Sequence, residues 1–123
     1  YNTAMGNSAM EYNVSGTHNS SFGHASLQNN TAGISNTAIG TQSLISSTGS
    51  NNVGLGYGAG TGFNAGNDNT FIGYNTTAGV SPITNSTAIG ANAVVTKSMP
   101  PGTVAVGFNA RLLNLTGDEF YVI

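Results

Sequence analysis

The chain has 123 residues, two basic and four acidic side chains, and a formal net charge of −2. This balance offers no basic surface for nucleic acid, and no run of 18 apolar residues offers a transmembrane helix. We therefore expect no nucleic-acid partner and no membrane insertion in this segment. Because cysteine is absent, the sequence carries no information on the redox compartment.

A glycine returns at almost fixed intervals along the chain. The steps between successive members are 17, 17, 16, 17, 17 and 17 residues. Fixed-period self-similarity indicates a solenoid, in which each repeat is one coil stacked on the last. We predict an all-β fold, a parallel β-roll or β-solenoid of about seven 17-residue coils. It occupies residues 1–123 as a single repeat domain, which we expect to be a segment of a longer fibrous protein. The anchor glycines are Gly6, Gly23, Gly40, Gly56, Gly73, Gly90 and Gly107.

A short strand is predicted in front of each anchor glycine, where the phrases NTAMG, NSSFG, NTAIG, NVGLG, NTFIG, STAIG and TVAVG occur. The residue immediately before the glycine is always a large hydrophobe, and we expect this column to point inward as the core ladder. Its members are Met5, Phe22, Ile39, Leu55, Ile72, Ile89 and Val106. The preceding residue points the other way, because successive strand residues alternate between faces.

That preceding column consists mainly of small residues and is predicted to form a flat outer surface. Small, flat, apolar faces suggest close approach to another surface. We therefore predict an interface between chains at Ala4, Ala38, Ala88 and Ala105.

The residue columns on either side of the strand predict the structure of the rest of each coil. The anchor glycine is expected to take a positive φ at a corner. A second short strand is predicted a few residues later, beside Met10, Leu27 and Leu44, and turn residues fill the remainder. An asparagine opens most coils, and its stacked side chains are expected to hydrogen-bond from rung to rung. These residues are Asn2, Asn19, Asn36, Asn52 and Asn69.

The column just after the glycine carries exposed aromatics, and two interpretations remain open. Aromatic faces stack on sugar rings, so the stripe is a candidate glycan contact. The same aromatics are also suited to packing on a neighbouring chain, which is a common use of exposed apolar stripes. The candidate stripe is His24, Tyr57, Tyr74 and Phe108.

The phrase NTAIGTQSL at 36–44, with its relatives NTAMGNSAM and STAIGANAV, resembles the head repeats of trimeric autotransporter adhesins of the YadA-like type. The resemblance implies a left-handed parallel β-roll with three chains around one axis. Similar NTAIG arrays also occur in phage and viral tail fibres. The present coils are longer than those of the adhesin heads. The resemblance implies a homotrimer at a cell or virion surface, with a cell-surface glycan or protein as its receptor.

Catalysis and metal binding find little support in the sequence. The two histidines, His18 and His24, occupy non-equivalent positions in adjoining coils, and we expect both on the outer surface. Asp118 and Glu119 are adjacent in a predicted turn, so their side chains point apart. Asp68 is a single acidic residue where calcium-binding β-rolls carry one in nearly every coil. We predict no enzyme activity, no catalytic residues, no metal site and no cofactor.

Two further binding functions, of a nucleotide and of ice, find little support in the sequence. GLGYGAGTG at 54–62 lacks the helix and acidic residue of a dinucleotide-binding unit, so we dismiss a nucleotide. A threonine ladder can match an ice lattice, and Thr3, Thr37, Thr70 and Thr87 form a partial one. However, Val53 and Val104 interrupt this ladder, and the strand period of two is expected to turn it inward.

The sequence thus predicts a structural and adhesive segment of an extracellular or virion-surface fibre, which presents a rigid trimeric rod for attachment. The alternative is a carbohydrate-binding or, less favoured, an ice-binding β-solenoid module.

Overall fold

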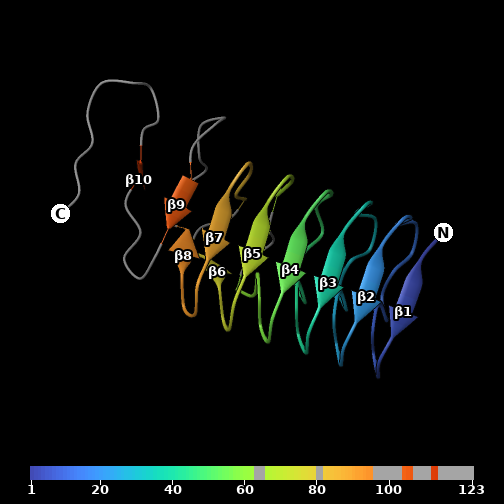
Figure 1. Ribbon diagram of the computed structural model, residues 1–123. Helices are drawn as coiled ribbons and strands as arrows, with labels where there is room; N and C mark the ends of the chain where they lie inside the picture. Colours follow the sequence, from blue (N-terminus) through green and yellow to red (C-terminus); the bar gives the residue numbers. More distant parts are fainter. Residues whose placement is uncertain (63–65, 80–81, 96–103, 107–111, 114–123) are drawn as a thin grey trace.

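The computed structural model describes residues 1–62, 66–79, 82–95, 104–106 and 112–113. It shows an all-β chain wound into a parallel β-solenoid of about 5 turns (Figure 1). This confirms the predicted all-β class and parallel solenoid architecture. The main sheet contains β1 (Thr3–Met5), β2 (Ser20–Phe22), β3 (Thr37–Ile39), β4 (Val53–Leu55), β5 (Thr70–Ile72), β7 (Thr87–Ile89), β9 (Val104–Val106) and β10 (Leu112–Leu113), in that order. The second sheet contains β6 (Thr77–Ala78) and β8 (Val94–Val95).

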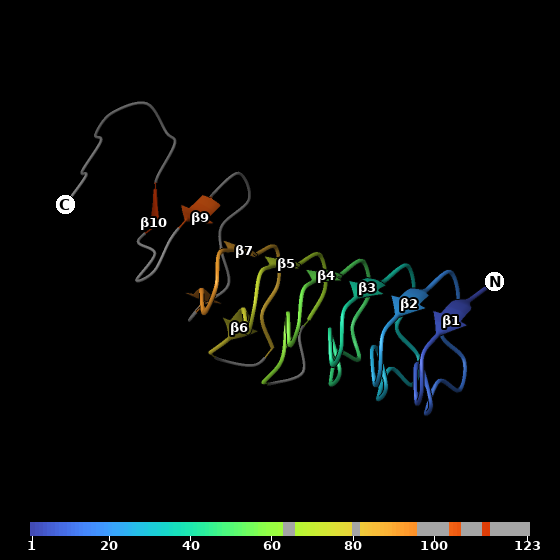
Figure 2. The ribbon, with the colours of Figure 1, turned by 60° about the horizontal axis from the view of Figure 1, so that its bottom comes forward.

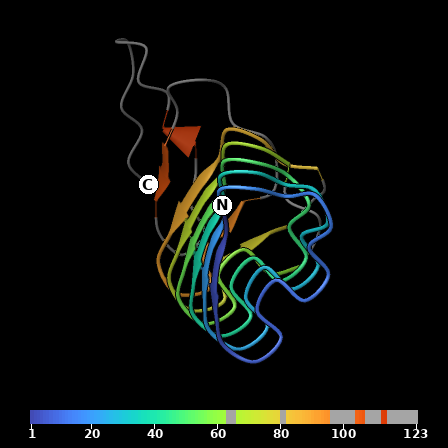
Figure 3. The same ribbon diagram turned by 90° about the vertical axis from the view of Figure 1, so that its right-hand side faces the viewer.

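The strands in front of the anchor glycines form one row along the solenoid, as Figure 2 shows. Strands β1 to β5, β7 and β9 pair in parallel, and each residue pairs with its repeat equivalent in the next coil. Viewed along the stack, successive coils follow nearly the same outline (Figure 3). The pair β9 and β10 is antiparallel and places Leu112 opposite Ala105.

The two faces of these strands are opposite to our expectation. Ala38 is fully buried, whereas its neighbour Ile39 is 44% exposed. The central residue of each other main-sheet strand from β2 to β7 is also buried, whether it is small or large. These residues are Ser21, Gly54, Phe71 and Ala88. The predicted core ladder is therefore wrong for five members, which are exposed: Met5, Phe22, Ile39, Leu55 and Ile89.

The remaining members of the two predicted columns differ from one another in burial. Ile72 is half-buried, so it does not form a core ladder either. Ala4, in the first coil, is exposed. Ala105 and Val106 pair with Ala88 and Ile89, but the burial of their side chains lies outside what the structure describes. The predicted alanine interface is wrong at Ala38 and Ala88, because these residues lie inside the coil.

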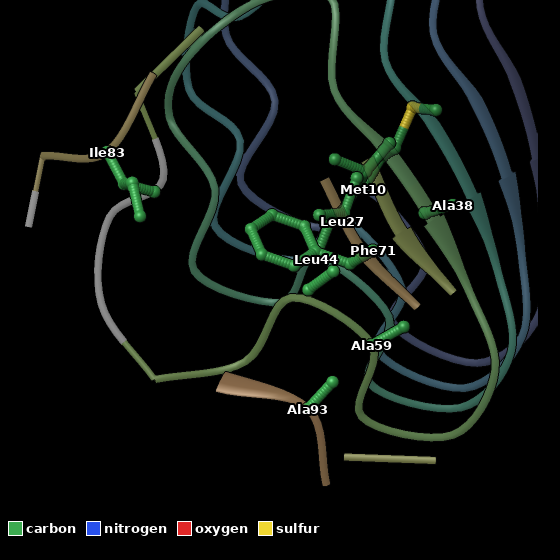
Figure 4. Packing of buried hydrophobic residues seen from close by; sticks show 9 residues of the cluster. Met10, Leu27, Ala38, Leu44, Ala59, Phe71, Ile83 and Ala93 are labelled. Atoms are coloured by element: carbon green, nitrogen blue, oxygen red, sulfur yellow. The ribbon is translucent and has the colours of Figure 1, made fainter. Parts of the chain in front are cut away.

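The reason for the inversion is that the large core residues come from the opposite wall of the coil. Leu27 and Leu44, four residues after their anchor glycines, are fully buried and Met10 nearly so (Figure 4). Interiors are packed to crystal-like density, so the narrow space left opposite these residues takes a small one. Alanine and serine on the strands fit there, and the large hydrophobe beside them must point outward.

At β5 the arrangement of large and small core residues is reversed, with the large residue on the strand and the small one on the opposite wall. Phe71 occupies the inward position of β5, where other coils have a small residue, and it is fully buried. The residue four places after the preceding anchor is Gly60 instead of a leucine. A Cβ built on Gly60 would lie 2.9 Å from Cδ2 of Phe71. The missing side chain at Gly60 therefore makes room for the phenyl ring.

The predicted second strand occurs only in later coils of the described chain. In the earlier coils the corresponding residues Met10, Leu27 and Leu44 have φ values of 53°, 48° and 49°, in the left-handed region. β-branched residues rarely adopt that conformation. Where Thr77 and Val94 occupy the position, the chain instead forms β6 and β8.

The anchor glycines turn the corner as predicted. Gly40 has a φ of 127°, and a Cβ built there would lie 2.5 Å from the carbonyl oxygen of Gly56 in the next coil. Both the backbone conformation and the close stacking of coils thus require glycine.

The predicted asparagine ladder is present, and it works mainly through the backbone. The Oδ1 of Asn19 accepts the backbone N–H of Asn36 at 2.9 Å, and Nδ2 of Asn36 donates to the carbonyl of Gly49 at 2.9 Å. The series runs from Asn2 to Asn69 and ends where the backbone N–H of Ser86 donates to Asn69. Buried polar side chains are therefore satisfied in every step of this ladder.

Candidate functional surfaces

The outer side of the main sheet carries two parallel rows of residues, which together we call the apolar face. The apolar row is the column that directly precedes the glycines, and the threonine row lies two residues earlier on the same side of each strand. The apolar row is Met5, Phe22, Ile39, Leu55, Ile72 and Ile89. The threonine row is Thr3, Ser20, Thr37, Val53, Thr70 and Thr87.

The apolar face is uncharged and regular. Both rows lie on strands that pair in parallel from β1 to β7, so each coil adds an equivalent pair of side chains. Of the charged residues within the described ranges, Glu11 lies in the turn after the first anchor and Asp68 lies in the turn before β5. Neither belongs to the face. In the described coils from β2 to β7, the outer side of the main sheet therefore carries the apolar face and not the predicted alanine column.

The aromatic stripe is present in part. Tyr57 and Tyr74 are 48% and 55% exposed, and their rings stack with centroids 5.3 Å apart and planes 16° apart. His24 is exposed two coils before Tyr57, with Thr41 between them in the same column. Phe108 lies outside the described residues. The structure therefore brings together the two tyrosines and leaves His24 apart from them.

Both histidines lie on the surface, as expected. Nδ1 of His18 lies 3.1 Å from Oγ1 of Thr17, and the imidazole ring stacks on Tyr1. Oδ1 of Asp68 accepts a hydrogen bond from Nδ2 of Asn51 at 3.0 Å in an exposed turn. Within the described residues, no group of three or more histidine or acidic side chains is placed to hold a metal ion. Asp118 and Glu119 lie outside these residues.

Among the described residues, Glu11 is the titratable group whose pKa is clearly shifted by its surroundings. A hydrogen bond from Gln28 at 2.6 Å, with a weaker contribution from Ser8, lowers the pKa of the Glu11 carboxyl below its ordinary value. The carboxyl is fully exposed. A lowered pKa on a solvated surface favours the ionised form and does not indicate an acid–base catalyst.

Within the part of the chain that the structure describes, no helix is both long and apolar enough to cross a membrane. Comparisons of the sequence with protein families and with curated proteins, and of the fold with solved structures, find no match. The apolar face and the tyrosine stack are the described surface features that bear on the function of this chain.

Proposed function

We propose that this chain is a structural and adhesive segment of a fibre on the outer surface of a cell or virion, where three copies form a rigid rod. The observation that carries the proposal is the apolar face, with its unbroken row of large hydrophobes from Met5 to Ile89. The expectation of three chains comes from the resemblance to trimeric adhesin heads. The proposal extends the described coils to about seven, as the sequence repeat indicates.

The apolar face has the properties of a surface that another copy covers. Monomeric soluble proteins rarely expose large contiguous apolar patches, and larger ones mark interaction sites. Within the described coils, this one runs the length of the stack from β1 to β7. Copies arranged in a closed ring with parallel solenoid axes repeat the same contact at every coil. The contact area therefore grows with the number of coils.

Such a rod suits attachment by mechanical and multivalent means. Each coil contacts chiefly its neighbours, and the parallel ladders and asparagine ladder link them along the axis. A stiff body with several copies of one weak contact gains avidity, because the later contacts form at a high effective concentration. Rigidity and copy number then serve adhesion without any catalytic site.

The test is to replace two members of the apolar row and compare the assembly with that of a matched control. Ile39→Thr combined with Leu55→Thr keeps residue types suited to an exposed strand and removes apolar area from the face. The control combines Ile34→Thr with Val14→Thr, because both residues are exposed and lie in turns off the face. Sedimentation velocity of each variant measures the assembly.

We expect the variant of the apolar row to dissociate at a concentration where the parent and the control remain assembled. Circular dichroism must show that all three proteins keep their β signal. Equal sedimentation of both variants and the parent would remove the apolar face as the interface.

A second candidate function for the same face is ice binding. Thr37, Thr70 and Thr87 lie on the outward row, so the expectation that they point into the core is wrong. A face that binds ice must stay open in solution. Thermal hysteresis in a monomeric preparation would support this function, whereas its absence in a stable oligomer would support the fibre segment.

A further inference from the structure

We propose that the stacked pair of Tyr57 and Tyr74 is a binding platform for a pyranose ring of a neutral glycan. This site belongs to a single chain and does not depend on the self-association proposed above. It identifies a receptor chemistry that a scaffold role alone leaves open.

Stacking covers one face of each ring and leaves the opposite face turned away from its partner tyrosine. The tyrosines occupy equivalent positions in adjacent coils, and their near-parallel planes, 16° apart, cover one face of each ring with the other. The neighbouring residues in the same column are Thr41, one coil before Tyr57, and Ala91, one coil after Tyr74. Both neighbours are much smaller than a phenol ring. Each side chain is about half exposed, and among the described residues neither ring stacks on a third aromatic ring.

Hydrogen bonds between coils hold the backbone that carries both rings. The N–H of Asn75 donates to the carbonyl of Tyr57, and the N–H of Asn92 donates to the carbonyl of Tyr74, each at 2.8 Å. These bonds continue the inter-coil ladder next to the aromatic column. Because each ring also stacks on the other, a ligand has less side-chain freedom to remove on binding.

The chemistry around the stack fits a neutral sugar. An aromatic face attracts the positively polarised C–H groups on one side of a pyranose, while its hydroxyl groups require hydrogen-bond partners. The two phenol hydroxyls and the exposed amide of Asn92, next to Ala91 in the sequence, are groups that both donate and accept. The charged residues within the described ranges, Glu11 and Asp68, lie in other columns of the repeat. The platform therefore favours a neutral ring over a sialylated or sulfated one.

The experiment titrates the purified chain with cellotetraose and, separately, with chitotetraose at millimolar concentration. Tyrosine ring resonances in NMR spectra report binding, and saturation transfer from protein to sugar C–H groups reports stacking. The variants are Tyr74→Ala and Asn92→Ala. Tyr12→Ala is the matched control, since Tyr12 is also 54% exposed and has no stacking partner among the described residues.

We expect at least one probe to shift the Tyr57 and Tyr74 resonances and to receive saturation transfer. Tyr74→Ala should abolish both signals, Asn92→Ala should weaken binding several-fold, and Tyr12→Ala should bind as the parent does. Absence of any shift with both probes at millimolar concentration would overturn the proposal.

Light scattering on the same samples separates this proposal from the alternative that the rings pack on a neighbouring chain. Unchanged mass in Tyr74→Ala, together with lost sugar binding, supports the platform. A lower mass without sugar binding by the parent assigns the stack to a contact between chains and overturns the platform. Failure of the apolar-face variants to change the mass bears on the fibre proposal and leaves this result unaffected.

Discussion

The backbone N–H of Asn52 donates to Oδ1 of Asn36 at 2.9 Å, although the two residues are 16 positions apart and most equivalent pairs are 17 apart. The ladder therefore keeps its register through the one shortened coil. Since both side chains are fully buried, each lost bond leaves a polar group without a partner in the interior.

The first prediction concerns this ladder. Asn36→Ala removes the acceptor for Asn52 and the donor for the carbonyl of Gly49. We expect the free energy of unfolding to fall by about 2–4 kcal/mol, because buried polar groups lose their partners. Asn29→Ala is the control, since Asn29 is exposed, and it should change the value by less than about 0.5 kcal/mol. Urea unfolding compares them, and equal effects would contradict a structural role for the ladder.

The second prediction concerns two buried serines at equivalent positions. Oγ of Ser43 is buried without a hydrogen-bond partner, whereas Oγ of Ser26 donates to the carbonyl of Gly23 at 2.9 Å and contacts Oγ of Ser21. We expect Ser43→Ala to leave the stability unchanged or to raise it by about 1 kcal/mol, and Ser26→Ala to lower it by a similar amount. Thermal unfolding measures both. A larger loss in Ser43→Ala than in Ser26→Ala would contradict this assignment.

The third prediction concerns coil length. Two residues, Thr31 and Ala32, separate Asn30 from Gly33, whereas Thr48 alone separates Ser47 from Gly49 in the shortened coil. Deleting Ala32 should therefore shorten a turn without shifting the strands, at a cost of about 1 kcal/mol or less. Deleting Ala38 reverses the faces of β3 and should prevent folding. Circular dichroism and protease resistance distinguish the two, and loss of structure in both would refute the prediction.

The fourth prediction concerns the exchange of volume between Phe71 and Gly60. Phe71→Ala should cost about 3–5 kcal/mol, because it opens a cavity in the core. Gly60→Leu should also destabilise, since a Cβ there would lie 2.9 Å from Cδ2 of Phe71 and 2.6 Å from Cδ2 of Leu44. Combined, the changes restore the leucine-and-alanine pairing of other coils.

We expect the double variant to be more stable than the sum of the single effects predicts, by about 1–3 kcal/mol. Denaturant unfolding of the four proteins completes the cycle. Simple additivity would show that Phe71 and a side chain at position 60 do not compete for the same space.

The fifth prediction concerns the two faces of β3. Ala38→Leu overfills the interior and should lower the stability of the chain by about 1–3 kcal/mol. Ile39→Ala should affect the stability of a single chain much less and should act on its self-association. Chemical unfolding below the assembly concentration tests this difference. A greater loss of stability in Ile39→Ala than in Ala38→Leu would contradict the burial of Ala38 and the exposure of Ile39.

The repeat predicted the solenoid, the glycine corners and the asparagine ladder because each depends on backbone geometry that recurs at a fixed period. The period of two in the strands shows that Ala38 and Ile39 face opposite ways, but not which of them lies inside. Large size favoured Ile39, yet Leu27 and Leu44 already filled the interior from the other wall. The sequence does hold one signal of this packing. Phe71 is large where other strands have a small residue, and Gly60 is small where other coils have a large one.

The residue column predicts a second strand in every coil, because residue types alone do not reveal the left-handed backbone conformation of the earlier coils. Leucine, methionine and glycine at this position take a left-handed φ, and the chain turns there. Thr77 and Val94 are β-branched and disfavour a left-handed φ, and each of them begins a strand, β6 and β8 respectively. The sequence predicts Tyr57 and Tyr74 as members of one exposed stripe, but their stacking contact depends on the three-dimensional register of adjacent coils.

The central claim is that the apolar face joins copies of this chain into a trimeric rod. Static light scattering of the chain, fused to a neutral trimerising tag and measured again after the tag is cleaved, tests it most directly. We predict that the cleaved protein keeps three times the 12.4 kDa mass of one chain. A stable, soluble species of one chain mass after cleavage would contradict the account and leave the apolar face open for another ligand.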